Sequence, residues 1–336
     1  MDSLTHLALG AAIGMATLGR RTALWKAALW GCVANTLPDL DVFINHGDAI
    51  SNVTLHRGHS HSLFWLTLLA PALAWGVARL HGEAALWRRW WLALWLSLVS
   101  HPLLDTLTVY GTQLLQPFSD HPYGVGSLFI IDPAYTVPLL VGVGVALARR
   151  DTVGLRWARG ALALSTLYLG WSLVAQWQVQ RVVGAQLAAA GVAPERVLVT
   201  PAPFNTLLWR IVVMRDGAYD EGFYSLLDSD RPIRFDAFTG DAALAQQAKP
   251  LPGVQQIASF SHGFYKLQER AGVVHVTDLR MGQEPAYAFS FRVGQRAAGG
   301  ALSAVAPVNE GLRGDVRAAL AWLGPRMLGS DIPPPR

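Results

Sequence analysis

Charged residues and cysteine are both scarce in this chain of 336 residues. Asp, Glu, Lys and Arg make up 15% of it, whereas 52% is hydrophobic and 13 residues are Trp. An ordinary soluble domain of this size has a larger share of charged residues, so the composition indicates a membrane protein. The single cysteine, Cys32, excludes both a disulfide framework and a thiolate metal site.

Several catalytic and binding motifs are missing as well. The chain has no Gly-rich phosphate loop, no Gly-x-Ser-x-Gly elbow and no His-Glu-x-x-His pair. The net charge of +4 does not indicate a nucleic-acid partner, because the basic residues separate apolar segments instead of forming one stripe. Candidate functional residues therefore have to be sought in other patterns.

Long apolar runs fill the first half of the chain. Three nearly uncharged runs have about the length that crosses ~30 Å of hydrocarbon, and three shorter runs are thin spans, tilted pairs or re-entrant hairpins. The sequence therefore predicts an α-helical polytopic membrane domain of about six helices over residues 1–180. The long runs are 62–80, 90–106 and 160–178, and the short ones are 4–19, 22–37 and 134–148.

Lysine and arginine are distributed unevenly between the loops that separate these runs. By the positive-inside rule, the loops rich in them face the cytoplasm. The loops at 38–61 and 107–133 carry a single basic residue, Arg57. We therefore expect a multi-pass protein of a bacterial inner membrane, with these two loops and everything after the sixth run on the periplasmic side. The basic residues of the other loops are Arg20, Arg21, Lys26, Arg79, Arg88, Arg89, Arg149, Arg150, Arg156 and Arg159.

A change of composition near Arg181 marks a second domain. Beyond it, Lys and Arg are spread along the chain, the apolar runs are short, and several segments alternate as strands do. The expectation is a soluble α+β domain with mainly antiparallel sheet over residues 181–330, followed by a disordered, proline-rich tail at 331–336. The expected strands are 196–200, 207–214, 273–279 and 286–293.

Histidine and aspartate gather in four short segments of the first 180 residues. In the six-span arrangement all four segments lie at the same membrane face, although only Lys and Arg were used to derive the topology. Imidazole and carboxylate groups bind divalent ions such as Zn²⁺ or Mn²⁺, and an open coordination position can activate water. The candidate ligands for one or two such ions are His6, Asp39, Asp41, His56, His61, His101 and Asp105.

The spacing of these residues supports a shared site. His101 and Asp105 are four apart, so on a helix they share one face and supply two ligands, or one ligand with its orienting carboxylate. Asp39 and Asp41 are two apart just after Pro38, so in an extended stretch their side chains point the same way. Alternatively, the first pair is an ordinary helix contact and the second pair belongs to a helix-ending turn.

Two further residues of the histidine-rich loop are candidates for catalysis. His59 could serve as a general acid or base, and Arg57 suits a phosphate or carboxylate group on the substrate. Asp132, just before Pro133, is either a further ligand or a helix cap.

The same segments resemble the family of LexA-binding, inner-membrane-associated metal-dependent hydrolases. This resemblance covers about the first 180 residues and implies a bacterial inner-membrane protein with metal-dependent hydrolase activity. The segments that carry it are Met1-Asp2-Ser3-Leu4-Thr5-His6, Pro38-Asp39-Leu40-Asp41, His56-Arg57-Gly58-His59-Ser60-His61-Ser62 and His101-Pro102-Leu103-Leu104-Asp105.

These patterns favour a membrane-embedded, metal-dependent hydrolase that acts at the membrane–water interface. Its partners would be membrane lipids, and its substrate an amphiphilic or lipid-linked ester or phosphoester, because a soluble substrate would not need a site there. The alternatives are a metal-binding transporter or sensor, and a membrane scaffold in which the metal is structural. The sequence identifies no protein partner.

Overall fold

The computed structural model describes residues 1–215, 217–228, 231–312 and 314–336. The chain forms two compact units. Unit 1 comprises Met1–Ile44, Arg57–Leu173 and Pro203–Asn205, and unit 2 comprises Asn45–His56, Val174–Ala202 and Thr206–Arg336.

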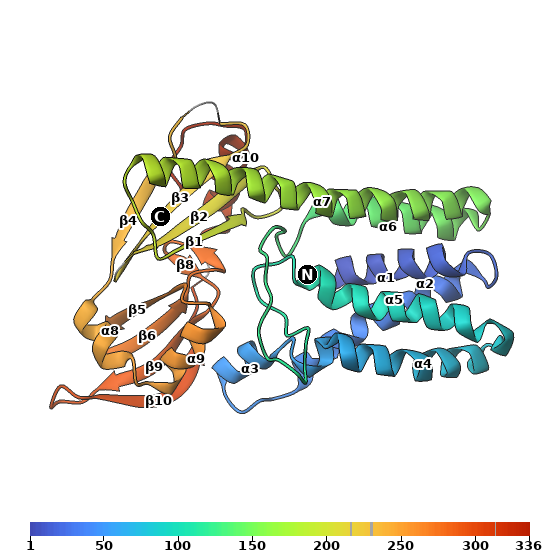
Figure 1. Cartoon of the computed structure of the whole chain (residues 1–336), viewed down its shortest axis with the longest axis horizontal. Helices are drawn as coiled ribbons and strands as arrows, with labels where there is room; N and C mark the ends of the chain where they lie inside the picture. The colour runs from blue at the N-terminus through green and yellow to red at the C-terminus, as the bar shows by residue number, and fades with distance from the viewer. Residues whose placement is uncertain (216, 229–230, 313) are drawn as a thin grey trace. The chain divides into compact units, whose positions relative to one another are not determined.

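Unit 1 is a bundle of α-helices (Figure 1). Its core contains Met15, Leu18, Leu94 and Leu98, which are fully buried. Short 3-10 helices connect several of the long ones. The α-helices are α1 (Ser3–Leu18), α2 (Leu24–Thr36), α4 (Leu63–Leu80), α5 (Trp87–Asp105), α6 (Pro133–Arg149) and the first part of α7 (Thr152–Ala189), and the 3-10 helices are η1 (Leu37–Phe43), η2 (His59–His61) and η3 (Ala84–Leu86).

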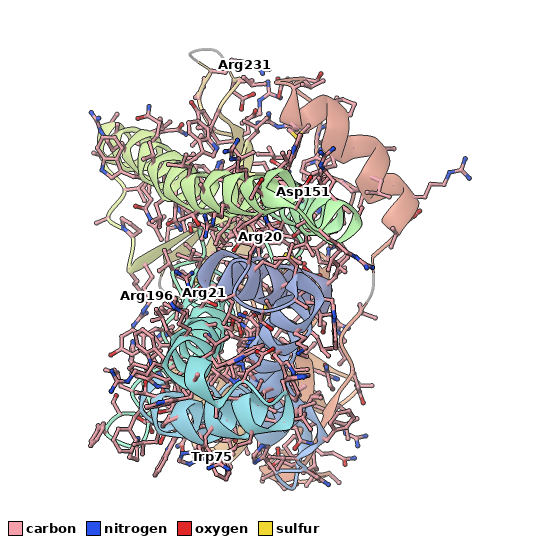
Figure 2. The ribbon with its side chains drawn as sticks, turned by 90° about the vertical axis from the view of Figure 1, so that its right-hand side faces the viewer. Arg20, Arg21, Trp75, Asp151, Arg196 and Arg231 are labelled. Atoms are coloured by element: carbon pink, nitrogen blue, oxygen red, sulfur yellow. The ribbon has the colours of Figure 1, made fainter. Side chains whose placement is uncertain are left out.

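The short loops that join successive long helices of unit 1 lie at the opposite end of the bundle from its candidate ligands (Figure 1). The α1–α2, α4–α5 and α6–α7 connections lie at one end of the bundle (Figure 1). Figure 2 looks at that end and labels Arg20 and Arg21 between α1 and α2, and Asp151 between α6 and α7. η1, η2 and the end of α5, which carry candidate ligands, lie at the opposite end of the helices (Figure 1).

Helices α1 and α2 pack closely because glycine faces glycine where they cross. A Cβ added to Gly10 would lie 2.6 Å from Asn35 Cβ and 2.7 Å from the carbonyl carbon of Gly31. Real side-chain carbons do not approach so closely, so the contact requires glycine. This packing brings Asn35 of α2 beside His6 of α1.

The prediction of a six-helix polytopic membrane domain is wrong. Among the described residues, α4 is the one helix that is long and apolar enough to cross a membrane. α1 has 16 residues and α6 has 17, so at ~1.5 Å per residue both fall short of ~30 Å of hydrocarbon. α5 begins with Trp87-Arg88-Arg89 and ends on His101 and Asp105, which lower its apolar content.

Unit 2 confirms the expected antiparallel sheet domain after the helices. Its described residues form two four-stranded sheets, ordered β1-β2-β3-β4 and β10-β9-β6-β5, and the small pair β7-β8. The strands are β1 (Arg196–Pro201), β2 (Leu208–Arg215), β3 (Ala218–Ser225), β4 (Phe235–Thr239), β5 (Tyr265–Arg270), β6 (Val273–Asp278), β7 (Gly282–Gln283), β8 (Ala286–Tyr287), β9 (Ser290–Arg296) and β10 (Leu302–Asn309).

The second part of α7 and four short helices complete the described part of unit 2. α9 packs its buried residues Val254 and Ile257 against the second sheet, and Ile50 of α3 joins the same core. Trp322 of α10 packs on Phe223 of the first sheet, with ring centroids 4.9 Å apart. The helices are α3 (Ala49–Leu55), α8 (Ala242–Ala248), α9 (Pro252–Phe260) and α10 (Val316–Met327).

Candidate metal centre

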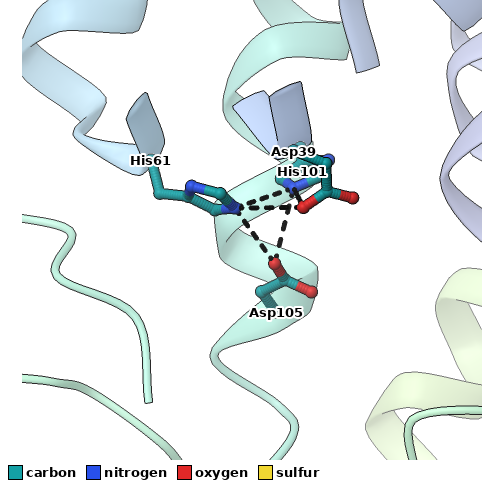
Figure 3. A group of neighbouring side chains, drawn as sticks. All are labelled: Asp39, His61, His101 and Asp105. Atoms are coloured by element: carbon teal, nitrogen blue, oxygen red, sulfur yellow. Dashed lines mark hydrogen bonds and ion pairs between the residues drawn. The ribbon is translucent and has the colours of Figure 1, made fainter. Parts of the chain in front are cut away.

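Four of the candidate ligands meet at one point in unit 1. Asp39 lies in η1, His61 ends η2, and His101 and Asp105 lie one turn apart in α5. Each offers one ligand atom, and these atoms all lie within 4.8 Å of one another. In Figure 3 the side chains of these residues converge on a common centre.

The distances between the ligand atoms are those of a compact coordination shell. The Nε2 atoms of His61 and His101 are 3.0 Å apart. Asp39 Oδ1 lies 3.5 Å from His61 Nε2 and 3.3 Å from His101 Nε2, and Asp105 Oδ2 lies 3.5 Å and 3.4 Å from the same atoms. Ligands ~2.0–2.1 Å from a tetrahedral zinc ion are about 3.3–3.4 Å from one another. The spacing therefore suits a zinc-sized ion.

The carboxylate of Asp105 tests whether a cation fits among these atoms. Its Oδ2 atom is buried and has no hydrogen-bond partner among the described residues. Arg57 Nε lies 3.2 Å from it and also lacks a hydrogen-bond partner. Arg57 thus balances the charge of this oxygen without a hydrogen bond to it, and an ion at the centre would supply the bonded partner that a buried carboxylate oxygen needs. The residues present therefore fit a divalent metal.

A hydrogen bond behind His101 determines which nitrogen faces the centre. His101 Nδ1 lies 2.5 Å from the backbone carbonyl oxygen of Asn35. A carbonyl oxygen can only accept, so Nδ1 carries the proton and Nε2 presents a lone pair to the centre.

Ser60 and Asp41 orient His61 in the same way. Ser60 Oγ donates to Asp41 Oδ2 at 2.6 Å and lies 2.9 Å from His61 Nδ1. Since the hydroxyl proton is directed at the carboxylate, we assign Nδ1 of His61 as the donor to the Ser60 oxygen, which leaves its Nε2 with a lone pair. Two lone pairs and two carboxylate oxygens then converge, and such a set requires a cation, either a metal ion or protons.

His6 lies behind the four ligands. Its ring stacks on His101 with centroids 3.7 Å apart, and its Nε2 is 3.2 Å from Asp105 Oδ1, the carboxylate oxygen that does not face the centre. Its Nδ1 is 3.1 Å from Asn35 Oδ1. His6 therefore supports Asp105 and His101 in this structure.

Arg57 places a buried positive charge next to the candidate ligands. Its NH1 donates to Thr108 Oγ1 at 3.3 Å, and its Cζ lies 4.8 Å from the centre of the Tyr110 ring. Its backbone has a φ of 64° and its N–H donates to Asp41 Oδ2 at 3.0 Å. The same aspartate thus fixes the backbone of Arg57 and, through Ser60, the ring of His61.

Asp39 is the most accessible of the four ligands. Its side chain is 20% exposed, whereas those of His61, His101 and Asp105 are fully buried. Burial acts to raise the pKa of Asp39, but hydrogen bonds from His101 and His61, which form when these rings are protonated on Nε2, outweigh it and hold the pKa well below its usual range. A low pKa keeps Asp39 in the ionised form that a metal ligand needs.

The structure places the other predicted residues outside the group of four. Asp41 lies behind His61, because the residues after Pro38 form the 3-10 helix η1 and not the expected extended stretch. His59 begins η2 and is exposed, and His56 follows α3 in unit 2. Asp132 caps α6 by accepting from the backbone of Ala134 and Tyr135, which confirms the second of its two predicted roles.

Two residues of the site were missed by sequence analysis. Asn35 is fully buried; besides its bonds to His101 and His6, its side-chain amide donates to the Ser97 carbonyl oxygen at 2.6 Å. The available signal was a lone amide in the apolar run 22–37, where an unpaired polar group would be costly. Ser60 offered none, because a serine in a polar loop is ordinary.

The histidine and aspartate side chains that converge at one end of the helical bundle form a candidate metal-binding site. The chain belongs to the YdjM inner membrane protein family, whose model matches residues 1–179, more than half of the sequence. All four clustered ligands lie within the matched residues.

Two relatives share part of the chain. One, named uncharacterized protein YfhP, from Bacillus subtilis, is 30% identical over 155 residues, which cover 43% of this chain and 46% of the relative. The other, named inner membrane protein YbcI, from Escherichia coli, is 37% identical over 123 residues, which cover 36% of this chain and 69% of the relative. The chain thus spans less than half of the first relative's length. No solved structure matches it.

Proposed function

We propose that this protein is a metal-dependent hydrolase of the inner membrane. The observation that carries the proposal is the convergence of two imidazole nitrogens and two carboxylate oxygens, in which the nitrogens lie 3.0 Å apart and each nitrogen lies 3.3–3.5 Å from both oxygens. A divalent ion held there, with Zn²⁺ or Mn²⁺ the best match to the donor set, would lower the pKa of a bound water to about 7.

Three features of the chain support hydrolysis of an anionic, amphiphilic substrate. Arg57 lies 3.2 Å from a ligand oxygen, where its charge could also attract a phosphate or carboxylate group. His59 is exposed and could exchange protons with a leaving group. His61 lies just before α4, the candidate membrane span, so the site suits an ester or phosphoester of a lipid or lipid-linked molecule.

Metal content tests the binding step of the proposal. Detergent-purified protein should contain one equivalent of a divalent metal by mass spectrometry, and His61→Ala and His101→Ala should each lose it. His46→Ala is the matched control, because His46 lies outside the group of four. Full metal content in both site variants, or no metal in folded wild type, would overturn the assignment.

Activity is tested separately, on micellar phosphoesters and carboxylic esters. Wild type should lose turnover when a chelator removes the metal and regain it with added Zn²⁺ or Mn²⁺, whereas His101→Ala should not respond. A metal-loaded protein that hydrolyses no member of either ester class would refute the hydrolase proposal and leave the metal site standing.

The four-ligand set itself favours a second candidate, a scaffold stabilised by a structural metal. Structural zinc sites have four protein ligands, whereas catalytic ones keep a position open for water. The exposed side of Asp39 is where such a position would have to arise. A cobalt-substituted protein whose visible spectrum changes on addition of azide has an accessible position and is compatible with catalysis, and an unchanged spectrum favours the scaffold.

A transporter or sensor is the less favoured alternative. The ligands gather at one end of the helices of unit 1, whereas transport sites usually lie midway along them. Uptake of radioactive zinc into proteoliposomes at a rate that depends on His101 would support transport instead.

A further inference from the structure

A pair of carboxylates faces each other across the first sheet of unit 2. Glu221 on β3 and Asp236 on β4 are direct partners in the antiparallel register. Side chains directly opposite one another lie on the same face of a sheet, and like charges in that position are destabilising. The Glu221 side chain is fully buried, which increases the cost of the arrangement unless a cation lies between the two groups.

Arg336 supplies that cation. Its NH1 donates to Glu221 Oε2 and its NH2 donates to Asp236 Oδ2. NH1 also lies 3.3 Å from the Glu284 carbonyl oxygen, and Cζ lies 5.1 Å from the centre of the Phe238 ring. Two carboxylates, a carbonyl and an aromatic face match the planar, multidentate chemistry of a guanidinium and not that of an ammonium.

The Glu221 carboxylate binds two arginine side chains, each through a different oxygen atom. Arg210, which is itself buried, binds Glu221 Oε1 with its Nε at 2.6 Å. Oε2 is therefore the atom that Arg336 takes. Glu221 would keep one partner if Arg336 left, so the position can exchange its occupant without leaving an isolated buried charge.

The segment that carries Arg336, residues 331–336, crosses the sheet as a strap over a cavity. Trp322 Nε1 donates to the Ile332 carbonyl oxygen at 3.2 Å, and Asp331 is 3.0 Å from the exposed Arg234. Between these points a cavity of about 330 Å³ remains, lined by side chains of the sheet and α10 and by Pro333 and Pro334. The strap is thus held at a few points and does not fill the space beneath it.

We propose that Glu221, Asp236 and Phe238 form a binding site for an arginine side chain, and that an arginine in a proline-rich segment of a partner protein exchanges with Arg336. Proline residues before the arginine keep such a segment extended and lower the entropy lost on binding. In this proposal the strap is an intramolecular competitor that regulates access to the site.

The test uses a fluorescent peptide with the sequence of residues 331–336, Asp-Ile-Pro-Pro-Pro-Arg, and the full chain in detergent micelles. By fluorescence anisotropy, Arg336→Ala should bind the peptide at least about tenfold more tightly than wild type, whose own strap competes at high effective concentration. A peptide ending in glutamine in place of arginine should bind at least about tenfold more weakly to the same variant.

A second substitution locates the site. Adding Asp236→Asn to Arg336→Ala should abolish the gain, and Asp236 is 56% exposed, so this variant is expected to fold. Adding Asp120→Asn, an exposed change in unit 1 that removes the same charge, should leave binding unchanged. Equal affinity of wild type and Arg336→Ala, or of the arginine and glutamine peptides, would overturn the proposal.

Discussion

The Ser60 hydroxyl connects a carboxylate to a candidate metal ligand. It donates to Asp41 and lies 2.9 Å from His61 Nδ1, so it fixes both the tautomer and the ring orientation of His61. Groups that orient a metal ligand in this way commonly change metal affinity by about 10–100-fold when they are removed. The two carboxylates of η1 therefore have different roles. Asp39 faces the candidate metal centre, and Asp41 orients His61 through Ser60.

Ser60→Ala should therefore weaken zinc binding without removing a ligand. We expect affinity to fall by about 10–100-fold, measured by competition with a chromophoric chelator. Ser303→Ala, an exposed change in unit 2, should leave affinity as it is. Unchanged zinc affinity in Ser60→Ala would show that the Asp41–Ser60–His61 chain has no orienting role.

The sequence predicted which residues gather at the site, but not which of them face its centre and which lie behind. The histidine and aspartate segments predicted Asp39, His61, His101 and Asp105, which do meet. Asp39 and Asp41 were expected to act alike, but a 3-10 helix has about three residues per turn, so positions two apart point in different directions. No spacing rule distinguishes these cases before the backbone conformation is known.

Among the helices, the α1–α2 contact determines the geometry beneath the site. Gly31→Ala would place a Cβ 2.7 Å from the Gly10 carbonyl carbon, which forces the helices apart and separates Asn35 from His6. We expect a cost of about 1–3 kcal/mol and weaker metal binding. The measurements are thermal melting and chelator competition.

Gly76→Ala in α4 is the matched control. A Cβ at Gly76 would meet nothing within 4 Å, so the same change should stabilise that helix by about 0.5–1 kcal/mol. If Gly31→Ala melts at the same temperature as Gly76→Ala, close packing of α1 on α2 does not limit stability.

Helix α10 is anchored to the first sheet through an ion pair whose contribution should depend on pH. Arg326 NH2 donates to Asp228 Oδ2 at 2.7 Å and to the Phe223 carbonyl oxygen at 2.9 Å. Burial acts to raise the pKa of Asp228, but hydrogen bonds from Arg326 and the Ser225 backbone outweigh it, so the pKa lies below its ordinary value of 3.8.

A carboxyl group with a lowered pKa stabilises the fold above its unfolded-state pKa, and this contribution is lost as pH falls through the folded-state value. Asp228→Asn should therefore lower the melting temperature most at pH 7, by an amount that corresponds to about 2 kcal/mol. The difference from wild type should shrink below about pH 4. A difference that is constant from pH 7 to pH 3 would contradict an ionic origin.

The orientation of the whole chain in a membrane follows from the charges on either side of α4, the candidate span. If α4 crosses the membrane, the positive-inside rule predicts that the loop before it faces the periplasm and that the arginine-rich turn after it faces the cytoplasm. In a Cys32→Ser background, Asn45→Cys should react with an impermeant maleimide on intact cells, and Ala85→Cys only after the cells are opened. Both positions are exposed. The reverse pattern would refute this orientation while leaving the metal site unaffected.

Composition and apolar runs predicted the helical first half and the antiparallel sheet domain, because both follow from local patterns. The number of spans was overestimated. The run 160–178 contains Trp, Ser, Thr, Tyr and Gln, and it forms part of the single 38-residue helix α7, which does not qualify as a span. Local hydropathy could not show that helices of 13–17 residues, such as α1, α2 and α6, are too short.

The position of His61, two residues before the first residue of α4, has a consequence for selectivity. If α4 crosses the bilayer, its first turn fixes the height of the candidate ion above the hydrocarbon. A hydrolase built this way would select a scissile bond by its distance from the hydrocarbon, and the identity of the head group would have little effect. Chain length should then matter little, and moving the ester one or two carbons along the molecule should matter greatly.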